Sequence, residues 1–203
     1  MHPIHTTPGF IIGSRPSGEA GKMISIFTRD LGLVFALAQG IRFEKSKLRS
    51  FTQDYSFGRF SFVRGKEYWR LTSAQEDNTN LRIYANDTNN ESTNGTQTLI
   101  ARIASLLERL LHGEQPNPEL FDCIYSCQLF IGENPRLNDE SLQTLESLIV
   151  VRILNRLGYI GDAAELNDRI QSTELAIELL DNLKSSRATI NKHINKALKE
   201  SHL

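Results

Sequence analysis

Four basic side chains lie within one short stretch of the chain, "GIRFEKSKLRSF", residues 40–51. Arg42, Lys45, Lys47 and Arg49 share this stretch with a single acid, Glu44. Such a cluster is poorly suited to bond making, but it can neutralise several phosphates of a nucleic-acid backbone at once. The alternative is a loop whose charges are merely solvated, and the residues of the stretch alone leave both interpretations open.

The charge of the whole chain is distributed unevenly. A net charge of −1 over 203 residues combines +5 in residues 1–84 with −6 in the remainder. The basic excess of the first part also includes Arg15, Lys22, Arg29, Arg59, Arg64 and Arg70. We therefore predict two units with different partners, the first of which contacts a polyanion.

Motifs that carry catalysis are missing from the sequence. "SGEAGKM" contains a Gly-Lys pair, but a phosphate-binding P-loop needs glycine where Pro16 stands and Ser or Thr where Met23 stands. No G-x-S-x-G, H-E-x-x-H or G-x-G-x-x-G motif occurs. We predict that the protein is not an enzyme and needs no cofactor.

The two cysteines, Cys123 and Cys127, are four residues apart, which places both on one apolar face of a helix. Zinc needs four ligands and no second Cys/His pair lies near, so we predict two buried thiols and no metal site. The sequence shows neither a signal-peptide pattern nor a segment of about 20 apolar residues. A cytoplasmic location without membrane contact is the resulting expectation.

The first third of the sequence has the pattern of a small β-domain. Short apolar runs separated by turn residues predict five strands, in residues 9–15, 22–28, 31–39, 55–63 and 67–74. A small sandwich, an SH3-like barrel and the five-stranded OB-fold barrel all fit this pattern. We expect a bulge or sharp bend at Gly58 and a positive φ at Gly65. His2 and His5 are expected in a frayed start.

The rest of the chain is predicted to be helical, which makes the fold class α+β. Residues 1–80 form the predicted barrel domain, the Asn- and Thr-rich residues 81–97 a linker, and residues 98–203 a helical domain. Apolar residues at helical spacing predict helices that end at Gly113, run from Pro118 to Gly132, and run from Asn138 to Gly158. Further helices are expected in residues 173–184 and 188–200.

Several segments of the sequence resemble the bacterial recombination mediator family RecO. "GEA", "FTRDLGL", "ALAQGIR" and "KSKLR" are similar in order and spacing to that family's N-terminal OB-fold. "GEQPNPELFDCIYSCQLF" and "RILNRLGYIGD" look like its helical domain. The resemblance extends across nearly the whole chain in the expected order, and it favours the OB-fold barrel among the three alternatives.

This resemblance implies a non-enzymatic function. RecO proteins bind single- and double-stranded DNA, anneal complementary strands and, with RecR, help RecA replace single-strand binding protein (SSB). The resemblance assigns DNA binding to Arg42, Lys45, Lys47 and Arg49, and also to Arg15 at the end of the first strand. It implies DNA, RecR and SSB as partners, and a cytoplasmic, nucleoid-associated location.

One departure from the family qualifies what is carried over. Many members have a four-cysteine zinc site after the "LGY" segment, whereas "LGYIGDAAELNDRI" has neither Cys nor His. Arg152 and Arg156 share a helix face and are candidates for binding the acidic tail of SSB, with salt bridges inside the bundle as the alternative. The competing function is a protein-interaction adaptor whose barrel binds polypeptide and whose basic loop is only solvated.

Overall fold

The computed structural model describes residues 3–43, 46–76, 91–160 and 167–200. The chain forms two compact units, one made of residues 1–80 with 104–118 and the other of residues 81–103 with 119–203. The structure groups residues 104–118 with the barrel, although they belong to the predicted helical domain. Each unit is described separately below.

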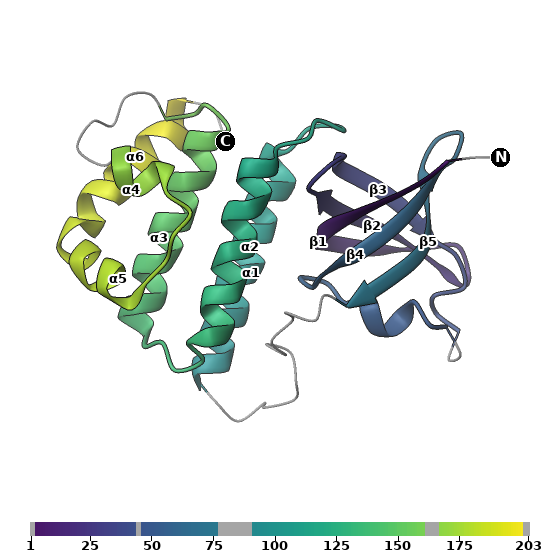
Figure 1. The fold of residues 1–203 in the computed structure, drawn as a ribbon, viewed down its shortest axis with the longest axis horizontal. Helices are drawn as coiled ribbons and strands as arrows, with labels where there is room; N and C mark the ends of the chain where they lie inside the picture. Colours follow the sequence, from purple (N-terminus) through teal and green to yellow (C-terminus); the bar gives the residue numbers. More distant parts are fainter. Residues whose placement is uncertain (1–2, 44–45, 77–90, 161–166, 201–203) are drawn as a thin grey trace. The chain divides into compact units, whose positions relative to one another are not determined.

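The first unit is built on a closed barrel of five strands (Figure 1). The strands are β1 (Ile4–Ser17), β2 (Gly21–Thr28), β3 (Gly32–Ala38), β4 (Phe57–Arg64) and β5 (Trp69–Glu76), in the order β1-β2-β3-β5-β4. β1 pairs antiparallel with both β2 and β4, and β3 pairs with β5 in parallel, which closes the barrel. The predicted α+β class and five-stranded OB-type barrel are confirmed.

Strand alternation fills the barrel with apolar side chains. In β3, Val34 and Ala36 point into the core, whereas Phe35 between them is exposed. Branched and aromatic residues from the other strands complete this core: Ile11, Ile24, Ile26, Phe60, Phe62, Trp69 and Leu71. β1 begins at Ile4, and the ring of His5 meets the Trp69 ring edge-on with centroids 5.3 Å apart. The expectation that His5 lies in a frayed start is therefore wrong.

The two glycines singled out in the strands have different roles from those predicted. The register shifts lie between Ile11 and Gly13 and between Ser61 and Phe62, so Gly58 does not mark a bulge. A side chain on Gly58 would instead lie 2.7 Å from the backbone oxygen of Gln75 on the neighbouring strand. Gly65 is not among the glycines with positive φ.

The helices follow the predicted order, with boundaries that differ by a few residues. They are α1 (Glu91–Leu110), α2 (Pro118–Glu133), α3 (Asp139–Arg156), α4 (Asn167–Gln171), α5 (Ile177–Leu183) and α6 (Arg187–Glu200), with a 3₁₀ turn η3 (Lys184–Ser186) before α6. α1 starts inside the predicted linker, of which residues 81–90 lie outside the described residues. The helix predicted to start at Asn138 does so: Asn138 caps α3, because its side-chain oxygen accepts a hydrogen bond of 2.9 Å from the Ser141 amide.

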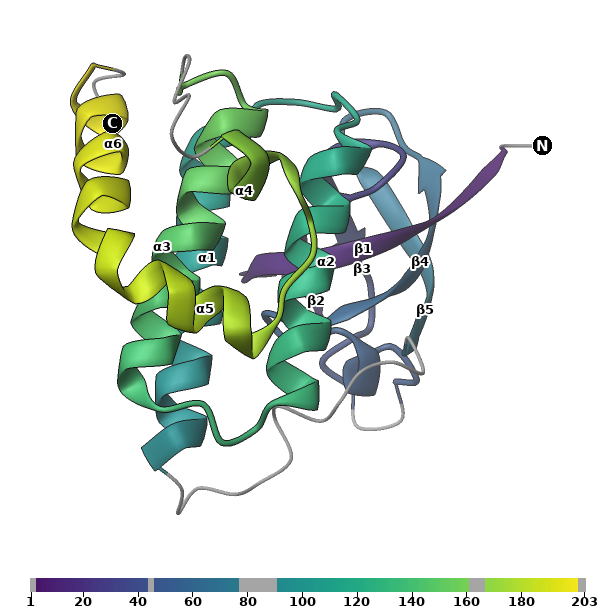
Figure 2. The same ribbon diagram turned by 60° about the vertical axis from the view of Figure 1, so that its left-hand side comes forward.

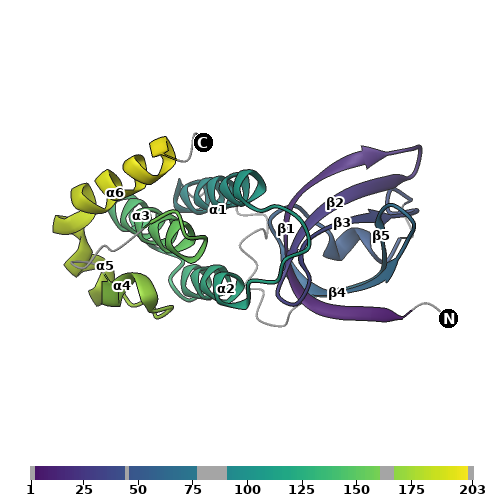
Figure 3. The same cartoon turned by 90° about the horizontal axis from the view of Figure 1, so that it is seen from above.

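Helix α3 is the central helix of the second unit. It lies between α1 and α2 on one side and α5 and α6 on the other (Figures 1 and 3), and Figure 2 shows α6 alongside it. Its middle, residues 148–154, is buried almost all round, as the sequence predicts. Cys123 and Cys127 on α2 are buried free thiols, in agreement with the prediction. Of the helices that the structure describes, none is long and apolar enough to cross a bilayer.

The central helix contains one fully buried charge. Arg152 is 0% exposed, and its guanidinium donates hydrogen bonds to the backbone oxygens of Arg169 and Glu174. Arg156 donates to the backbone oxygens of Ile170 and Gln171. Arg152 forms no salt bridge within the described residues, and because it is fully buried it has no surface to offer an acidic peptide. The interpretation of Arg152 as part of an SSB-tail site is therefore wrong.

Candidate nucleic-acid interface

The basic segment after β3 is fixed to one end of the barrel by three apolar side chains. Ile41 is buried in the barrel core, and Leu48 and Phe51 pack against the same core. Phe51 ends the short 3₁₀ helix η1 (Arg49–Phe51). Because these three residues face inward, the charged residues between them face outward: Arg42, Lys47 and Arg49 are all exposed.

Hydrogen bonds within the segment hold its described residues in successive turns. The amides of Phe43, Ser46 and Arg49 donate to the backbone oxygens three residues earlier, at distances of 3.0–3.2 Å. The buried hydroxyl of Thr52 donates to the Leu48 oxygen at 2.7 Å. Gly40, with φ of 67°, opens this series of turns in a conformation that residues with a side chain rarely adopt.

Arg42 and Arg15 belong to the same region of the barrel. The Arg42 amide donates to the Ala20 oxygen and its guanidinium donates to the Glu19 oxygen, both at 3.2 Å, so the segment is bonded to the turn between β1 and β2. Arg15, exposed near the end of β1, lies opposite Met23 in the same hairpin. The structure thus brings Arg15 to the hairpin that Arg42 contacts. Lys45 lies outside the described residues.

The strand register adds a further cation to this end of the barrel. Arg15 pairs with Met23, Met23 with Leu37, and Leu37 with Arg70, so one cross-strand row begins and ends with an exposed arginine. Arg70 contributed to the predicted basic excess, but its place in this row depends on the parallel pairing of β3 with β5. That pairing joins residues distant in the sequence and could not be read from local periodicity.

Three exposed aromatic rings lie on the same unit. Phe43 is 64% exposed between the cations of the segment, Tyr68 is 47% exposed before β5, and Phe35 is 45% exposed on β3. Aromatic rings in such positions can stack on nucleobases. Strand alternation accounts for the exposure of Phe35, since both its neighbours face inward.

The cations of this surface differ in their ion pairing from Arg64, an arginine of the same unit. In the part of the chain that the structure describes, no ion pair joins Arg15, Arg42, Lys47 or Arg49 to a carboxylate. Arg64, by contrast, pairs with Glu114 and lies 4.8 Å from the centre of the Trp69 ring. These four cations therefore keep their field available to an external anion.

Glu114 is an example of a charged side chain whose partners lie within the same unit, namely Arg64 and Trp69. Partial burial acts to raise the pKa of the Glu114 carboxyl, but hydrogen bonds from Arg64 and from the Trp69 indole, with the Arg64 charge, outweigh it and hold the pKa below its usual value. This contact ties residue 114, just after Gly113, to the ends of β4 and β5. The contact has a structural role, and because Arg64 is already paired with Glu114 we exclude Arg64 from the candidate interface.

The arrangement can bind anions and stack on bases, and it brings together no acid, base and nucleophile. Within the described residues there is also no cluster of three or more His, Cys, Asp or Glu side chains that could hold a metal ion. We define the loop surface as Arg15, Arg42, Lys47 and Arg49 with the exposed ring of Phe43.

Comparison with known proteins relates the chain to one family. The family model described as "Recombination protein O N terminal" matches residues 1–76, which end where β5 ends. A DNA repair protein RecO of Desulfitobacterium hafniense is 25% identical over 176 residues, covering 85% of this chain and 59% of the relative. The corresponding protein of Halalkalibacterium halodurans is 27% identical over 129 residues, covering 64% of this chain and 48% of the relative.

A shorter match reaches a higher identity. A DNA repair protein RecO of Alkaliphilus metalliredigens is 32% identical over 69 residues, 34% of this chain and 28% of the relative. In each of these comparisons the chain covers less than two thirds of the relative's length.

Proposed function

We propose that the chain is a RecO protein that acts in DNA repair and recombination as a DNA-binding mediator, with the loop surface as a contact to the phosphate backbone. The observation that carries this proposal is the anchoring of the basic segment. Ile41, Leu48 and Phe51 fix it to the barrel core, and exposed cations project from it with no ion-paired carboxylate among the described residues. Such a surface binds any sequence of DNA, which a protein acting at arbitrary gaps requires.

In the proposed mode of binding, two interactions contribute to the free energy of binding: phosphate neutralisation and base stacking. Lys47 and Arg49 neutralise phosphates and release counterions, which makes the affinity independent of sequence and sensitive to salt. Phe43 adds stacking on an unpaired base, which favours single strands over a closed duplex. Annealing follows when two neutralised strands are held close together. No catalytic step is assigned to the chain.

The finer parts of the proposal rest on the family resemblance. They are binding to both single- and double-stranded DNA, assistance to RecA on SSB-coated DNA together with RecR, and a cytoplasmic location at the nucleoid. The buried position of Arg152 removes one candidate for the SSB contact and leaves the residues of that contact unassigned.

Fluorescence anisotropy with a labelled single-stranded oligonucleotide, measured across a salt series, tests the loop surface. The variant Lys47→Ala/Arg49→Ala removes two exposed charges, and it keeps Arg42, whose side chain also bonds to the β1–β2 turn. We expect the slope of log K against log salt to fall by about 1.4, at about 0.7 per single-strand phosphate contact. Phe43→Ala should weaken binding by about 1–3 kcal/mol at unchanged slope.

The matched control is Arg59→Ala/Lys66→Ala, which removes two exposed charges from the same barrel outside the loop surface. Its slope should stay within about half a unit of the native value. Equal effects of the two double variants would mean that only net charge matters and would overturn the assignment of the loop surface. A native chain that does not bind DNA would favour the protein-interaction adaptor.

A further inference from the structure

The last helix of the second unit presents a row of lysines opposite its buried face. α6 buries Ile190, Ile194 and Ala197. Lys192, Lys196 and Lys199 follow one another at spacings of four and three residues and are all exposed. At 3.6 residues per turn these two sets point in opposite directions. We call Lys192, Lys196 and Lys199 the α6 lysine row.

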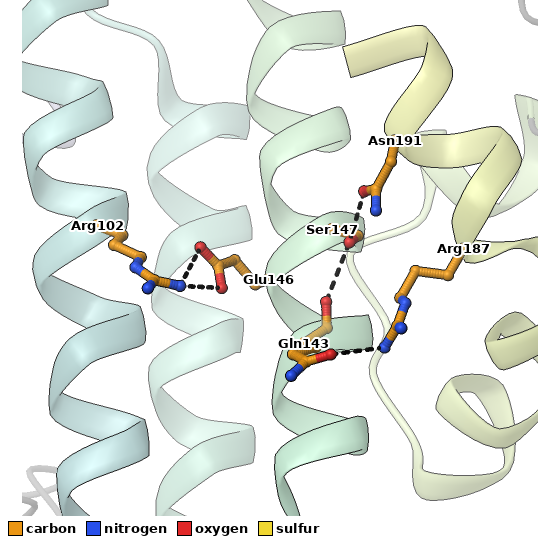
Figure 4. A network of polar contacts seen from close by, with 6 residues as sticks. All are labelled: Arg102, Gln143, Glu146, Ser147, Arg187 and Asn191. Atoms are coloured by element: carbon orange, nitrogen blue, oxygen red, sulfur yellow. Dashed lines mark hydrogen bonds and ion pairs between the residues drawn. The ribbon is translucent and has the colours of Figure 1, made fainter. Parts of the chain in front are cut away.

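The helix that carries this row is held firmly on α3. The Ser147 hydroxyl donates to the Asn191 side chain at 2.8 Å, and Arg187 donates to Gln143 at 3.0 Å, as Figure 4 shows. These contacts and the three buried apolar residues fix which face of α6 points to solvent. The lysine row is therefore a defined surface and not a set of charges on a free tail.

The row stays uncompensated although its unit is acidic. Lys184, just before α6, is held by Asp181 at 2.9 Å and by Glu140 at 3.3 Å. In the row, Lys196 has one long contact of 3.9 Å with the exposed Glu200. Lys192 and Lys199 have no ion pair among the described residues.

From this geometry we propose that the α6 lysine row is a second phosphate-binding surface, on a different unit from the loop surface, and that it takes the backbone of a second nucleic-acid strand. The proposal deepens the function proposed above and rests on it. The row extends from Lys192 to Lys199, seven residue steps or about 10 Å at 1.5 Å per residue. That length is about three phosphate spacings along one strand of a duplex.

The chemistry of the surroundings favours a nucleic-acid backbone over other anions. A membrane-binding helix needs an exposed apolar face beside its cations, but the apolar face of α6 is buried. The exposed large apolar side chains of the described residues are Ile4, Phe35, Phe43, Tyr68 and Ile177, none of which lies on α6. A row of point charges without an apolar anchor fits a partner that carries a row of opposite charges, as a nucleic-acid backbone does.

Two separate surfaces predict that one chain can bridge two strands. In the bridging assay, energy transfer is measured between donor- and acceptor-labelled, non-complementary single strands mixed with the intact chain. The variant Lys192→Gln/Lys199→Gln removes two charges and leaves the Lys196–Glu200 contact in place. We expect it to lose at least half of the energy transfer and to lower the total salt slope by about 1.4.

The control Arg136→Gln/Arg169→Gln makes the same change in net charge with exposed residues of the same unit. It should retain native transfer and slope, and far-UV circular dichroism should show that both variants keep native helicity. Native transfer and slope in the lysine variant, or equal losses in the control, would overturn the second surface.

The comparison with Lys47→Ala/Arg49→Ala separates failure of this inference from failure of the proposed function. If the loop variant loses affinity while the lysine variant bridges normally, DNA binding stands and the second surface is wrong. If only the lysine variant loses affinity, α6 is supported and the loop assignment is wrong. Absence of DNA binding by the native chain overturns both.

Discussion

Replacing Arg152 tests whether a buried cation without a carboxylate stabilises this fold. Its Nε and Nη2 atoms donate to the Arg169 oxygen at 3.0 and 2.8 Å, and Nη2 also donates to the Glu174 oxygen at 3.1 Å. Arg169 lies in α4, which ends at Gln171, so its carbonyl is one of those that lack a partner inside the helix. Arg152 thus satisfies backbone groups at the end of α4, although burial lowers its own pKa.

The magnitude follows from the groups that lose partners. Arg152→Met keeps most of the volume but leaves the oxygens of Arg169 and Glu174 without their donor, at about 1–3 kcal/mol each. The same change relieves the burial of a guanidinium whose Nη1 has no hydrogen-bond partner, which offsets part of this cost. We expect a net loss of about 1–3 kcal/mol for Arg152→Met and about 3–5 kcal/mol for Arg152→Ala, which adds a cavity.

Urea unfolding followed by two signals measures this effect. Trp69 is the only tryptophan and lies in the barrel, so its fluorescence reports on the first unit, whereas ellipticity at 222 nm reports mainly on the helices. At a denaturant slope of about 2 kcal/mol per molar urea, the ellipticity midpoint should fall by about 0.5–1.5 M for Arg152→Met. Arg136→Ala, an exposed arginine of the same unit, should stay within about 0.5 kcal/mol of native.

One outcome would refute this reasoning about Arg152. If Arg152→Met unfolds at the native midpoint or above it, water satisfies the two carbonyls and the buried charge is a net cost, as can happen for buried ions.

Three further predictions concern the barrel and the thiols. The pKa of Glu114 is lower in the folded chain than in the unfolded one, so its contact with Trp69 contributes full stability above the unfolded pKa of about 4.3. This contribution is lost as the pH falls through the lower folded pKa, and Trp69 emission should titrate in that range. A titration that persists in Glu114→Gln would contradict this prediction. Gly32 has φ of 73°, and a side chain there would collide with backbone atoms. Gly32→Ala should therefore lower the free energy of unfolding, followed by Trp69 fluorescence, by at least about 1–2 kcal/mol, whereas Gly13→Ala, which has open space around it, should leave it unchanged. Equal losses in the two variants would refute the argument. Burial raises the pKa of both cysteine thiols, so neither should react with an aromatic disulfide reagent at pH 8 until urea is added, and rapid native reaction would show that the α2 face is open.

The sequence predicted those features that local patterns determine. Apolar runs separated by turn residues predicted the five strands, and the helix predicted to start at Asn138 begins there. Both depend on neighbours a few positions away. The choice of a closed barrel among the three β-architectures depended on the family resemblance.

Contacts between distant segments explain the errors. Gly58 was expected to bend its strand, but it allows the backbone of Gln75 to approach, and that contact depends on the register of β4 with β5. Arg152 was a candidate for binding an acidic tail or for salt bridges inside the bundle, but its partners are backbone oxygens of α4, 17 residues later, and of Glu174. The spacing of residue types along the sequence does not indicate that backbone carbonyls of other segments will lie beside Arg152.

The anchoring of the loop surface links these two kinds of information to the proposed function. Ile41, Leu48 and Phe51 are spaced seven and three residues apart, which is a helical spacing. The segment nevertheless forms turns and one short 3₁₀ helix, so the common burial of these residues against the barrel core could only be seen in three dimensions. Because the backbone around them is already ordered, DNA binding need not order it, and the cost of association falls mainly on long side chains. Under the proposed function, Lys47 and Arg49 follow phosphates in many positions from a fixed support. This division between a fixed support and adaptable charges lets the proposed surface, which has no base-reading contacts, bind any strand and release it as salt or a competing protein takes the phosphates.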